Sequence, residues 1–175
     1  GAQLSLSGDD GITLAHDVSA NGTLGLTTIN SAITQIAGSL TVAGTSSIDA
    51  GIGAIALDGV GNQFGQAVSL SVGATQIRAS DALTLGTLAT GSLAASSTGA
   101  LNLGSGHVAG TLLASSGGAI SQSGALTVTG TASLGAGTDI ALTNAGNDFQ
   151  GALSLTGLAV RVTDSNNLLL GAVNA

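Results

Sequence analysis

Asn62-Gln-Phe-Gly-Gln-Ala-Val-Ser-Leu70 returns later in the chain as Asn147-Asp-Phe-Gln-Gly-Ala-Leu-Ser-Leu155. The match extends upstream, where Leu40-Thr-Val42 recurs as Leu126-Thr-Val128. Overall the internal repeat covers about residues 36–86 and 120–171, and the offset between matching residues varies between 83 and 86. Turns therefore gain or lose a residue while strands keep their phase. A long period that tolerates such slips is typical of a stacked repeat fold.

The composition also favours a narrow, regular core. Among 175 residues there are 29 Gly and 2 Phe, and there is no Trp, Tyr, Met, Cys or Pro. Ordinary globular cores use aromatic and Met side chains to fill irregular space. Here Leu, Ile, Val and Ala must fill the interior, which is feasible when every layer repeats the same small packing problem.

Charge is scarce, and its sign excludes some partners. Charged residues make up 6% of the chain, against about 25% in typical proteins. The net charge is −7, and the only bases are Arg78 and Arg161. Binding to nucleic acid needs clusters of Lys and Arg, so we expect no nucleic-acid partner. Residues 82–138 lack Asp and Arg, but Gly, Ser and Thr interrupt them throughout, so we expect no membrane span.

Short strands are predicted along the whole chain. Two apolar residues separated by one small residue recur between clusters of Gly, Asn, Asp and Ser, which is the pattern of strands joined by turns. Ser31–Ile36 could form one helical turn, but Gly38 follows closely, so we expect a strand or corner there. Examples of the strand pattern are Leu4-Ser-Leu6, Ile12-Thr-Leu14, Ile55-Ala-Leu57, Val68-Ser-Leu70, Leu83-Thr-Leu85, Leu101-Asn-Leu103, Ile140-Ala-Leu142 and Leu168-Leu-Leu170.

Parallel stacking explains these strands better than an antiparallel sandwich. A sandwich would use two-residue hairpin turns, and Asn21-Gly22 is the one dipeptide of the Asn-Gly type. We therefore predict an all-β fold, a parallel β-helix (β-solenoid) with coils of roughly 20 residues. The distance along the chain from Asn62 to Asn147 then corresponds to about four coils. The chain forms about 8–9 coils and a rod of roughly 40 Å, at about 4.8 Å per coil.

The ends of such a rod expose unpaired backbone groups. The sequence opens at Gly1 and closes at Ala175 within strand-like patterns, and it offers no capping helix. We therefore expect residues 1–175 to form a single solenoid segment of a longer array. The expected partners are further repeats, or identical copies, stacked at the open coil ends.

The second half of the chain resembles a known family. The run from Leu126 to Leu155, followed by Val160-Arg-Val-Thr-Asp-Ser-Asn-Asn-Leu-Leu-Leu-Gly171, is similar to the repeat region of bacterial filamentous haemagglutinin-type large exoproteins. Similar repeats occur in autotransporter adhesin passengers, and Leu40–Gly86 shares the resemblance. It implies a right-handed β-helix, secretion, a place outside the cell or on the bacterial outer surface, and a stalk or adhesive role. Repeats of this family carry no catalytic residues, so none is transferred.

Possible metal sites are weak. Asp9 and Asp10 are adjacent carboxylates of the kind that suits Ca²⁺, but Gly and Asp are also the ordinary residues of a polar turn, which we favour. His16 and His107 stand alone, without a Cys or a second His nearby, and are expected at the surface. We predict no metal and no cofactor.

Enzymatic activity is not expected either. Glycan-cleaving sites need two carboxylates at a defined separation, whereas the remaining acids are scattered singly. Arg78 with Asp81, and Arg161 with Asp164, share one repeat position; we expect local ion pairs, with a recurrent ligand contact as the alternative. The scattered acids are Asp49, Asp58, Asp81, Asp139, Asp148 and Asp164.

Phe64 and Phe149 are equivalent in the repeat and should fill the same interior or corner niche about four coils apart. Exposed platforms for sugar stacking are the alternative. The function predicted from the sequence is therefore structural: a rigid stalk or filament segment of a secreted or surface-attached bacterial adhesin. A carbohydrate-binding adhesive face, for host or matrix glycans, is the first alternative, and a polysaccharide-active β-helix enzyme is the second.

Overall fold

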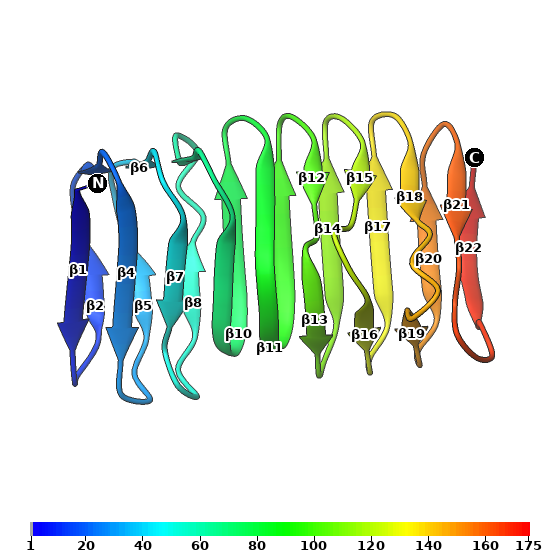
Figure 1. Cartoon of the computed structure of the whole chain (residues 1–175), viewed down its shortest axis with the longest axis horizontal. Coiled ribbons are helices and arrows are strands. Elements are labelled where there is room, and N and C mark those ends of the chain that lie inside the picture. Colours follow the sequence, from blue (N-terminus) through cyan, green and yellow to red (C-terminus); the bar gives the residue numbers. More distant parts are fainter. Residues whose placement is uncertain (1) are drawn as a thin grey trace.

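The computed structural model describes residues 2–175, so Gly1, where the strand pattern was expected to open, lies outside the described residues. It is a rod of parallel strands with the chain termini at opposite ends (Figure 1). The predicted β-solenoid is confirmed: about nine turns follow one another at roughly 20 residues each. All assigned elements of residues 2–175 are strands, so no helix there could span a membrane.

Each complete turn contributes to three faces of the rod, which we number in chain order. Face 1 carries eight strands that pair in parallel from one turn to the next. They are β1 (Gln3–Gly8), β4 (Thr23–Thr28), β7 (Ser46–Asp49), the first part of β10 (Val68–Ala79), the middle of β11 (Leu83–Ser97), β13 (Ser105–Val108), β16 (Leu126–Val128) and β19 (Asp148–Phe149).

Face 2 follows face 1 along the chain and has the same parallel pairing. Its second strand, β5, confirms the strand expected within residues 31–36. The strands of face 2 are β2 (Ile12–Leu14), β5 (Ile33–Gln35), β8 (Ile55–Leu57), the last parts of β10 and β11, β14 (Leu112–Ser116), β17 (Ala132–Ala136), β20 (Leu153–Thr156) and β22 (Leu170–Asn174).

Face 3 closes each turn. Its first three strands form one ladder and its last five another. The amide of Ser80 donates to the carbonyl of Asn62 over 2.8 Å and links the two ladders. The strands are β3 (Val18–Ala20), β6 (Leu40–Val42), β9 (Gln63–Phe64), the start of β11, β12 (Leu101–Asn102), β15 (Ile120–Ser121), β18 (Ile140–Leu142) and β21 (Val160–Val162).

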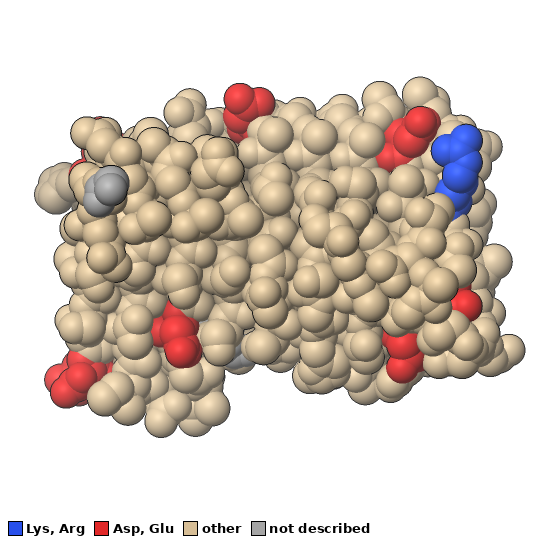
Figure 2. Space-filling model, viewed as in Figure 1, with Lys and Arg blue, Asp and Glu red and all other residues tan. Residues whose placement is uncertain are grey.

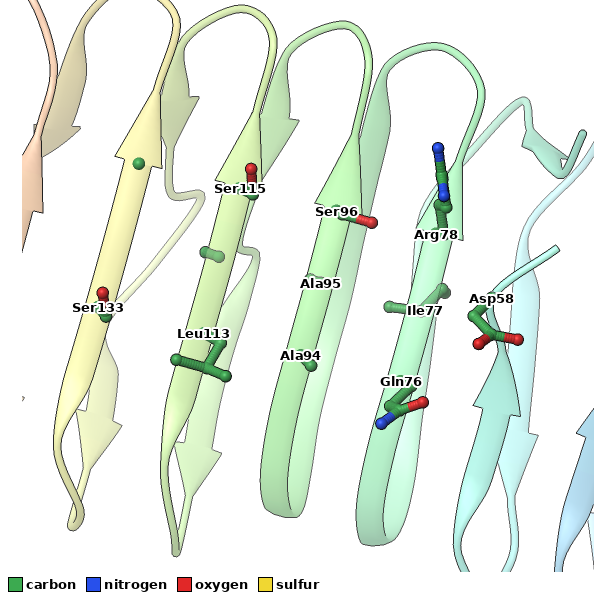
Figure 3. A pocket seen from close by; sticks show the side chains of 12 residues that line it. Asp58, Gln76, Ile77, Arg78, Ala94, Ala95, Ser96, Leu113, Ser115 and Ser133 are labelled. Carbon is green, nitrogen blue, oxygen red and sulfur yellow. The ribbon is translucent and has the colours of Figure 1, made fainter. Parts of the chain in front are cut away.

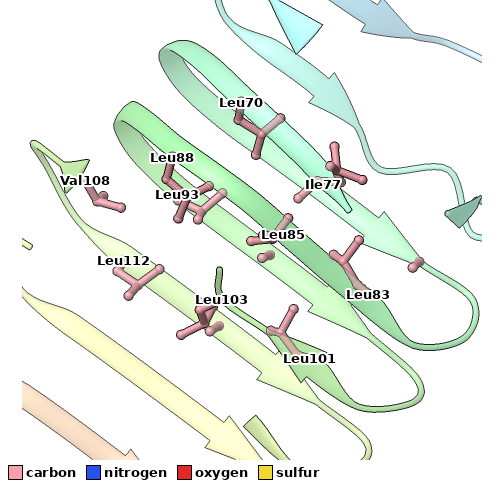
Figure 4. Packing of buried hydrophobic residues seen from close by; sticks show 14 of the residues in the cluster. Leu70, Ile77, Leu83, Leu85, Leu88, Leu93, Leu101, Leu103, Val108 and Leu112 are labelled. Carbon is pink, nitrogen blue, oxygen red and sulfur yellow. The ribbon is translucent and has the colours of Figure 1, made fainter. Parts of the chain in front are cut away.

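Aliphatic rows fill the space between the faces. On face 1, Leu26 pairs with Ile48, Ile48 with Leu70 and Leu70 with Leu88, and all four side chains are buried. Figure 4 shows the same packing in the middle of the rod, where leucines from successive turns meet between the sheets. Each buried Leu or Ile contributes about 1.5–3 kcal/mol relative to an exposed one. The expected slim, aliphatic interior is therefore confirmed.

The turns differ in length, and this difference affects the predicted number of turns in one internal repeat. Leu70 pairs with Ile48 in the turn before it and with Leu88 in the turn after it, and the stretch of chain up to Leu88 is the shorter of the two. A register shift between Val68 and Leu70 accompanies the shorter turn, where β10 and β11 each continue through a corner without a break.

Because of these short turns, the internal repeat is longer than four turns. Along face 3, Leu83 pairs with Leu101, Leu101 with Ile120 and Ile120 with Ile140. Phe64 lies in β9 on face 3, and the strand four turns later on the same face is β18. Phe149 lies one strand beyond β18, in β19 on face 1. The repeat spans four turns plus one face, so the expectation of about four coils per period was short by one face.

Candidate binding groove

A groove of about 560 Å³ crosses face 2 over five consecutive turns (Figure 3). Its floor and walls come from strands β10, β11, β14 and β17, together with Asp58, which directly follows β8. The lining residues are Asp58, Gln76, Ile77, Arg78, Ala94, Ala95, Ser96, Leu113, Ala114, Ser115, Ser133 and Gly135.

Side-chain size explains why the sheet is hollow here. Alternate residues of a strand point outward, and on β11 and β17 these are Ala94, Ser96, Ser133 and Gly135. A Cβ atom added at Gly135 would meet no atom within 4 Å, so the space above it is open. The longer side chains of Gln76 and Arg78 stand on β10 at one side of the floor.

The groove holds one of only two basic residues in the chain. The predicted ion pair of Arg78 with Asp81 does not form among the described residues, because Asp81 instead accepts the amide of Ala82 over 2.8 Å. The pair of Arg161 with Asp164 fails in the same way, since Asp164 accepts the amide of Phe149 over 2.9 Å. Both predictions were wrong because backbone amides lie closer to these carboxylates than the guanidinium groups do. The Arg78 guanidinium is therefore left to the groove.

The groove combines three kinds of contact. The Arg78 guanidinium suits a carboxylate or sulfate group, and the hydroxyls of Ser96, Ser115 and Ser133 can exchange hydrogen bonds with sugar hydroxyls. Leu113, 53% exposed, adds an apolar contact. Asp58 is the single carboxylate in the lining, so the groove does not assemble the carboxylate pair of a glycoside hydrolase.

The most elaborate polar site is internal. Asn62 is fully buried, and its side-chain oxygen accepts from the Leu40 amide and the Gln35 side chain, both over 2.8 Å. Its amide group donates to Gln35 and to the carbonyl of Leu57. All these groups are paired, so this site holds a corner of the rod together rather than binding a ligand.

The same network is built again around Asn147. Its side-chain oxygen accepts from the Leu126 amide over 3.0 Å and from the Gln122 side chain over 2.7 Å. Its amide group donates to Gln122 and to the carbonyl of Leu142. Neither Asn was singled out from the sequence, although both lead the repeated segment, because each sits where a solvent-exposed turn was expected.

Other residues considered from the sequence lie apart from the groove. Asp9 and Asp10 are exposed in the corner between β1 and β2, and His16 is exposed as well. His107, also exposed, has Nε2 3.2 Å from the Thr129 hydroxyl. Within residues 2–175, no group of three or more His, Cys, Asp or Glu is arranged to hold a metal ion.

The two Phe rings are interior, as expected. Phe64 is 6% exposed and Phe149 1%, so the alternative of exposed sugar-stacking platforms was wrong. Each follows one of the buried Asn residues by two positions, which gives the rings the same local setting. They belong to different faces, however, because the repeat is longer than four turns.

Two carboxylates elsewhere have shifted acidities. Hydrogen bonds from the amide and hydroxyl of Ser39 hold the pKa of Asp17 below its usual value. Hydrogen bonds from the side chains of Gln150 and Asn166 likewise lower the pKa of Asp148. The hydrogen bonds of Asp17 with Ser39 and of Asp148 with Asn166 connect neighbouring turns at the surface, so they stabilise the stacking of the turns.

Comparison with known proteins agrees with the repeat architecture. The profile of a family described as repeats of unknown function (DUF5649) matches residues 1–71 and 90–156. Comparisons with curated proteins and with solved structures gave no significant match.

Proposed function

The chain belongs to the DUF5649 family of repeats of unknown function, and from that premise we propose that it works as a rigid structural segment. Its role is that of a stalk or filament module in which turns of one repeat stack on turns of the next. The observation that carries the proposal is the unbroken parallel pairing of successive turns along the rod on faces 1 and 2. Bending such a rod would separate hydrogen-bonded strands on one side.

The two ends support continuation of the stack. Leu83 and Leu85 are buried in the middle of the rod, whereas Leu170, the counterpart of Leu85 in the last turn, is 54% exposed. Val173 is 48% exposed. At the other end Leu4 and Leu6 are only partly buried. Another turn on each end would cover these side chains, so the partners we propose are further repeats or identical copies.

The location we propose rests on the resemblance to haemagglutinin-type repeats. A secreted or surface-attached bacterial adhesin, outside the cell or on the outer surface, needs a long stiff spacer. A rod with a hydrogen-bonded wall and few charges meets that need without disulfides, since the chain has no Cys.

Electron microscopy of the purified chain, with sedimentation at increasing concentration, tests this function. We expect rods of constant width whose length grows with concentration. Compact particles that remain monomeric at every concentration would contradict the proposal.

The groove on face 2 favours a second candidate function, binding of host or matrix glycans. The test is a glycan array probed with the wild type, with Arg78→Ala and with Arg161→Ala. If the groove binds an acidic glycan, Arg78→Ala loses that binding while Arg161→Ala, outside the groove, keeps it. Equal binding by all three proteins would contradict this candidate.

A further inference from the structure

The chain contains one internal example of how the start of a repeat sits on the end of another. The family match begins at residue 1 and again at residue 90. Leu4 and Ile12 in the first copy correspond to Leu93 and Leu101 in the second, with the same spacing within each pair. The last part of β11 is therefore the second copy's version of β1, and β12 is its version of β2.

At this internal junction the new copy begins on β10. Arg78 pairs with Ser96 in the parallel register of β10 and β11. On the neighbouring face, Thr84 pairs with Asn102. The junction is covered on both sides and its inward side chains, among them Leu83 and Leu93, are buried.

The last turn of the rod repeats the part of that junction on which the second repeat begins, namely the segments around Arg78 and Leu83. Arg161 corresponds to Arg78, and Leu168-Leu-Leu170 corresponds to Leu83-Thr-Leu85. In the described structure, no further turn pairs with these segments on the C-terminal side. We propose that a second copy of this chain docks there head to tail, with its β1 on β21, its β2 on residues 168–170 and its β3 on β22. The inference rests on the proposed stacking function and adds its partner and its register.

This register turns the second copy by two faces relative to the first copy, one face for each of the two repeats in a chain. β21 belongs to face 3, whereas β1 begins face 1 of its own copy. The first of these two one-face steps occurs inside the chain, where the last part of β11 carries the second repeat's first strand on face 2. The register also brings the start of the second copy next to the end of the first. β22 lies on face 2 and ends near the corner that leads to face 3, and β1 of the second copy lies on face 3.

Head-to-tail polarity follows from strand direction and apolar surface. Stacking an end on the opposite end keeps all strands parallel, as they are throughout the rod. The partly buried Leu4, Leu6 and Ile12 of the first turn would meet the partly buried Val160 and Leu168 of the last. These are the same kinds of side chain that close the internal junction.

Charge disfavours the pairing of two first turns. On the side drawn in Figure 2, basic atoms lie near the C-terminal end, whereas acidic atoms lie near both ends. In the proposed register Arg161 lies opposite Ser7 of the second copy, two residues from its Asp9. The first turn also carries Asp10 and Asp17 and no Lys or Arg, so two first turns that face each other would repel.

Disulfide crosslinking tests the register, because the chain has no Cys of its own. Three rotations of the second copy are possible, and each places a different outward-facing residue opposite Arg161. The partner is Ser7 in the proposed register, Thr13 or Ser19 in the others. Neighbouring parallel strands bring Cα atoms about 4.8 Å apart, within the range of a disulfide. The variants combine Arg161→Cys with Ser7→Cys, Thr13→Cys or Ser19→Cys.

We expect mild oxidation to link Arg161→Cys/Ser7→Cys into a ladder of dimers and longer chains, at least ten-fold more than the other two variants. A second variant, Leu169→Cys/Thr13→Cys, reports the same register from another side and keeps Arg161. It should give a similar ladder. Circular dichroism and the single-Cys variants serve as folding and background controls.

The outcomes separate the two proposals. If the wild type associates but the ladder forms through Thr13 or Ser19 opposite residue 161, or through none of these pairs, the register is overturned and stacking stands. If the wild type stays monomeric at every concentration, both proposals fail.

Discussion

Phe64 and Phe149 hold the same position in the internal repeat, yet Phe64 lies in β9 on face 3 and Phe149 lies in β19 on face 1. The two rings share a local setting, including a buried Asn two residues earlier, but not a side of the rod. Each repeat therefore advances the pattern by one face. A surface feature that every repeat carries would return to the same side only with every third copy.

The buried Asn residues should be the most sensitive polar positions. Replacing Asn147 by Ala leaves the Leu126 amide and the side-chain oxygen of Gln122 without a partner inside the rod, and it removes one of the two hydrogen bonds to the Leu142 carbonyl. Each unpaired buried group costs about 1–3 kcal/mol, so we expect a loss of about 2–4 kcal/mol in the free energy of unfolding, measured with urea. Asn62→Ala should lose a similar amount.

Asn21→Ala is the control for these two variants, since Asn21 is exposed and makes no side-chain hydrogen bond within the described residues. Its free energy of unfolding should match that of the wild type. Equal stability of all three variants would show that the paired Asn side chains do not hold the corners.

Glycines at one corner allow successive turns to approach closely. A Cβ atom at Gly130 would lie 2.5 Å from the carbonyl oxygen of Gly110, in the turn below. The amide of Gly130 donates to that same oxygen over 3.0 Å, so the two turns cannot separate without losing this bond. We expect Gly130→Ala to lower the free energy of unfolding by about 1–3 kcal/mol.

Gly135→Ala provides a matched control on the next strand, because its Cβ would meet open space. It should leave stability unchanged or raise it by about 0.4–1 kcal/mol through the unfolded chain. Thermal unfolding of both variants followed by circular dichroism measures the difference. A Gly130→Ala variant as stable as Gly135→Ala would contradict the close stacking at this corner.

Acid should weaken the rod through Asp17 and Asp148. Hydrogen bonds lower the pKa of both carboxylates in the folded state, so their ionised forms favour folding. This stabilisation is complete above the pKa of the unfolded chain, about 3.9, and disappears as the pH falls through the lower folded pKa. Thermal melting temperatures at pH 7, 5, 4 and 3 should therefore drop most below pH 4.

The double variant Asp17→Asn/Asp148→Asn should show a smaller drop over the same interval, because its side chains do not titrate. The double variant Asp9→Asn/Asp10→Asn removes two exposed carboxylates that make no hydrogen bond in the described structure, and it serves as control. If the first variant has the same acid profile as the wild type, the hydrogen-bonded carboxylates do not contribute.

Much of the fold could be predicted from local pattern. Alternating pairs such as Ile55-Ala-Leu57 place one row of side chains inward, and the recurrence of such pairs at a regular interval then requires stacked turns. The short turns could not be predicted in this way. The sequence around Leu70 does not show whether its partner in the next turn is Leu88 or a later residue, because the pairing register depends on how many residues each corner contains.

The groove was not predicted because its residues are neighbours only across turns. Gln76, Ala94 and Leu113 come from three successive turns, and none forms a motif with the others in sequence. The ion pairs of Arg78 and Arg161 were predicted wrongly because spacing along the chain does not reveal that a backbone amide donates to each carboxylate. The resemblance to haemagglutinin-type repeats remains a hypothesis about export and location.

The most direct test of the one-face advance is a disulfide across the short turn. Gln76 pairs with Ala94 of the following turn in the structure; a repeat of four equal turns would instead place Ser97 beside it. We expect the monomer of Gln76→Cys/Ala94→Cys to lose both free thiols on mild oxidation, and Gln76→Cys/Ser97→Cys to keep them. Closure of the Ser97 pair with the Ala94 pair left open would contradict the account.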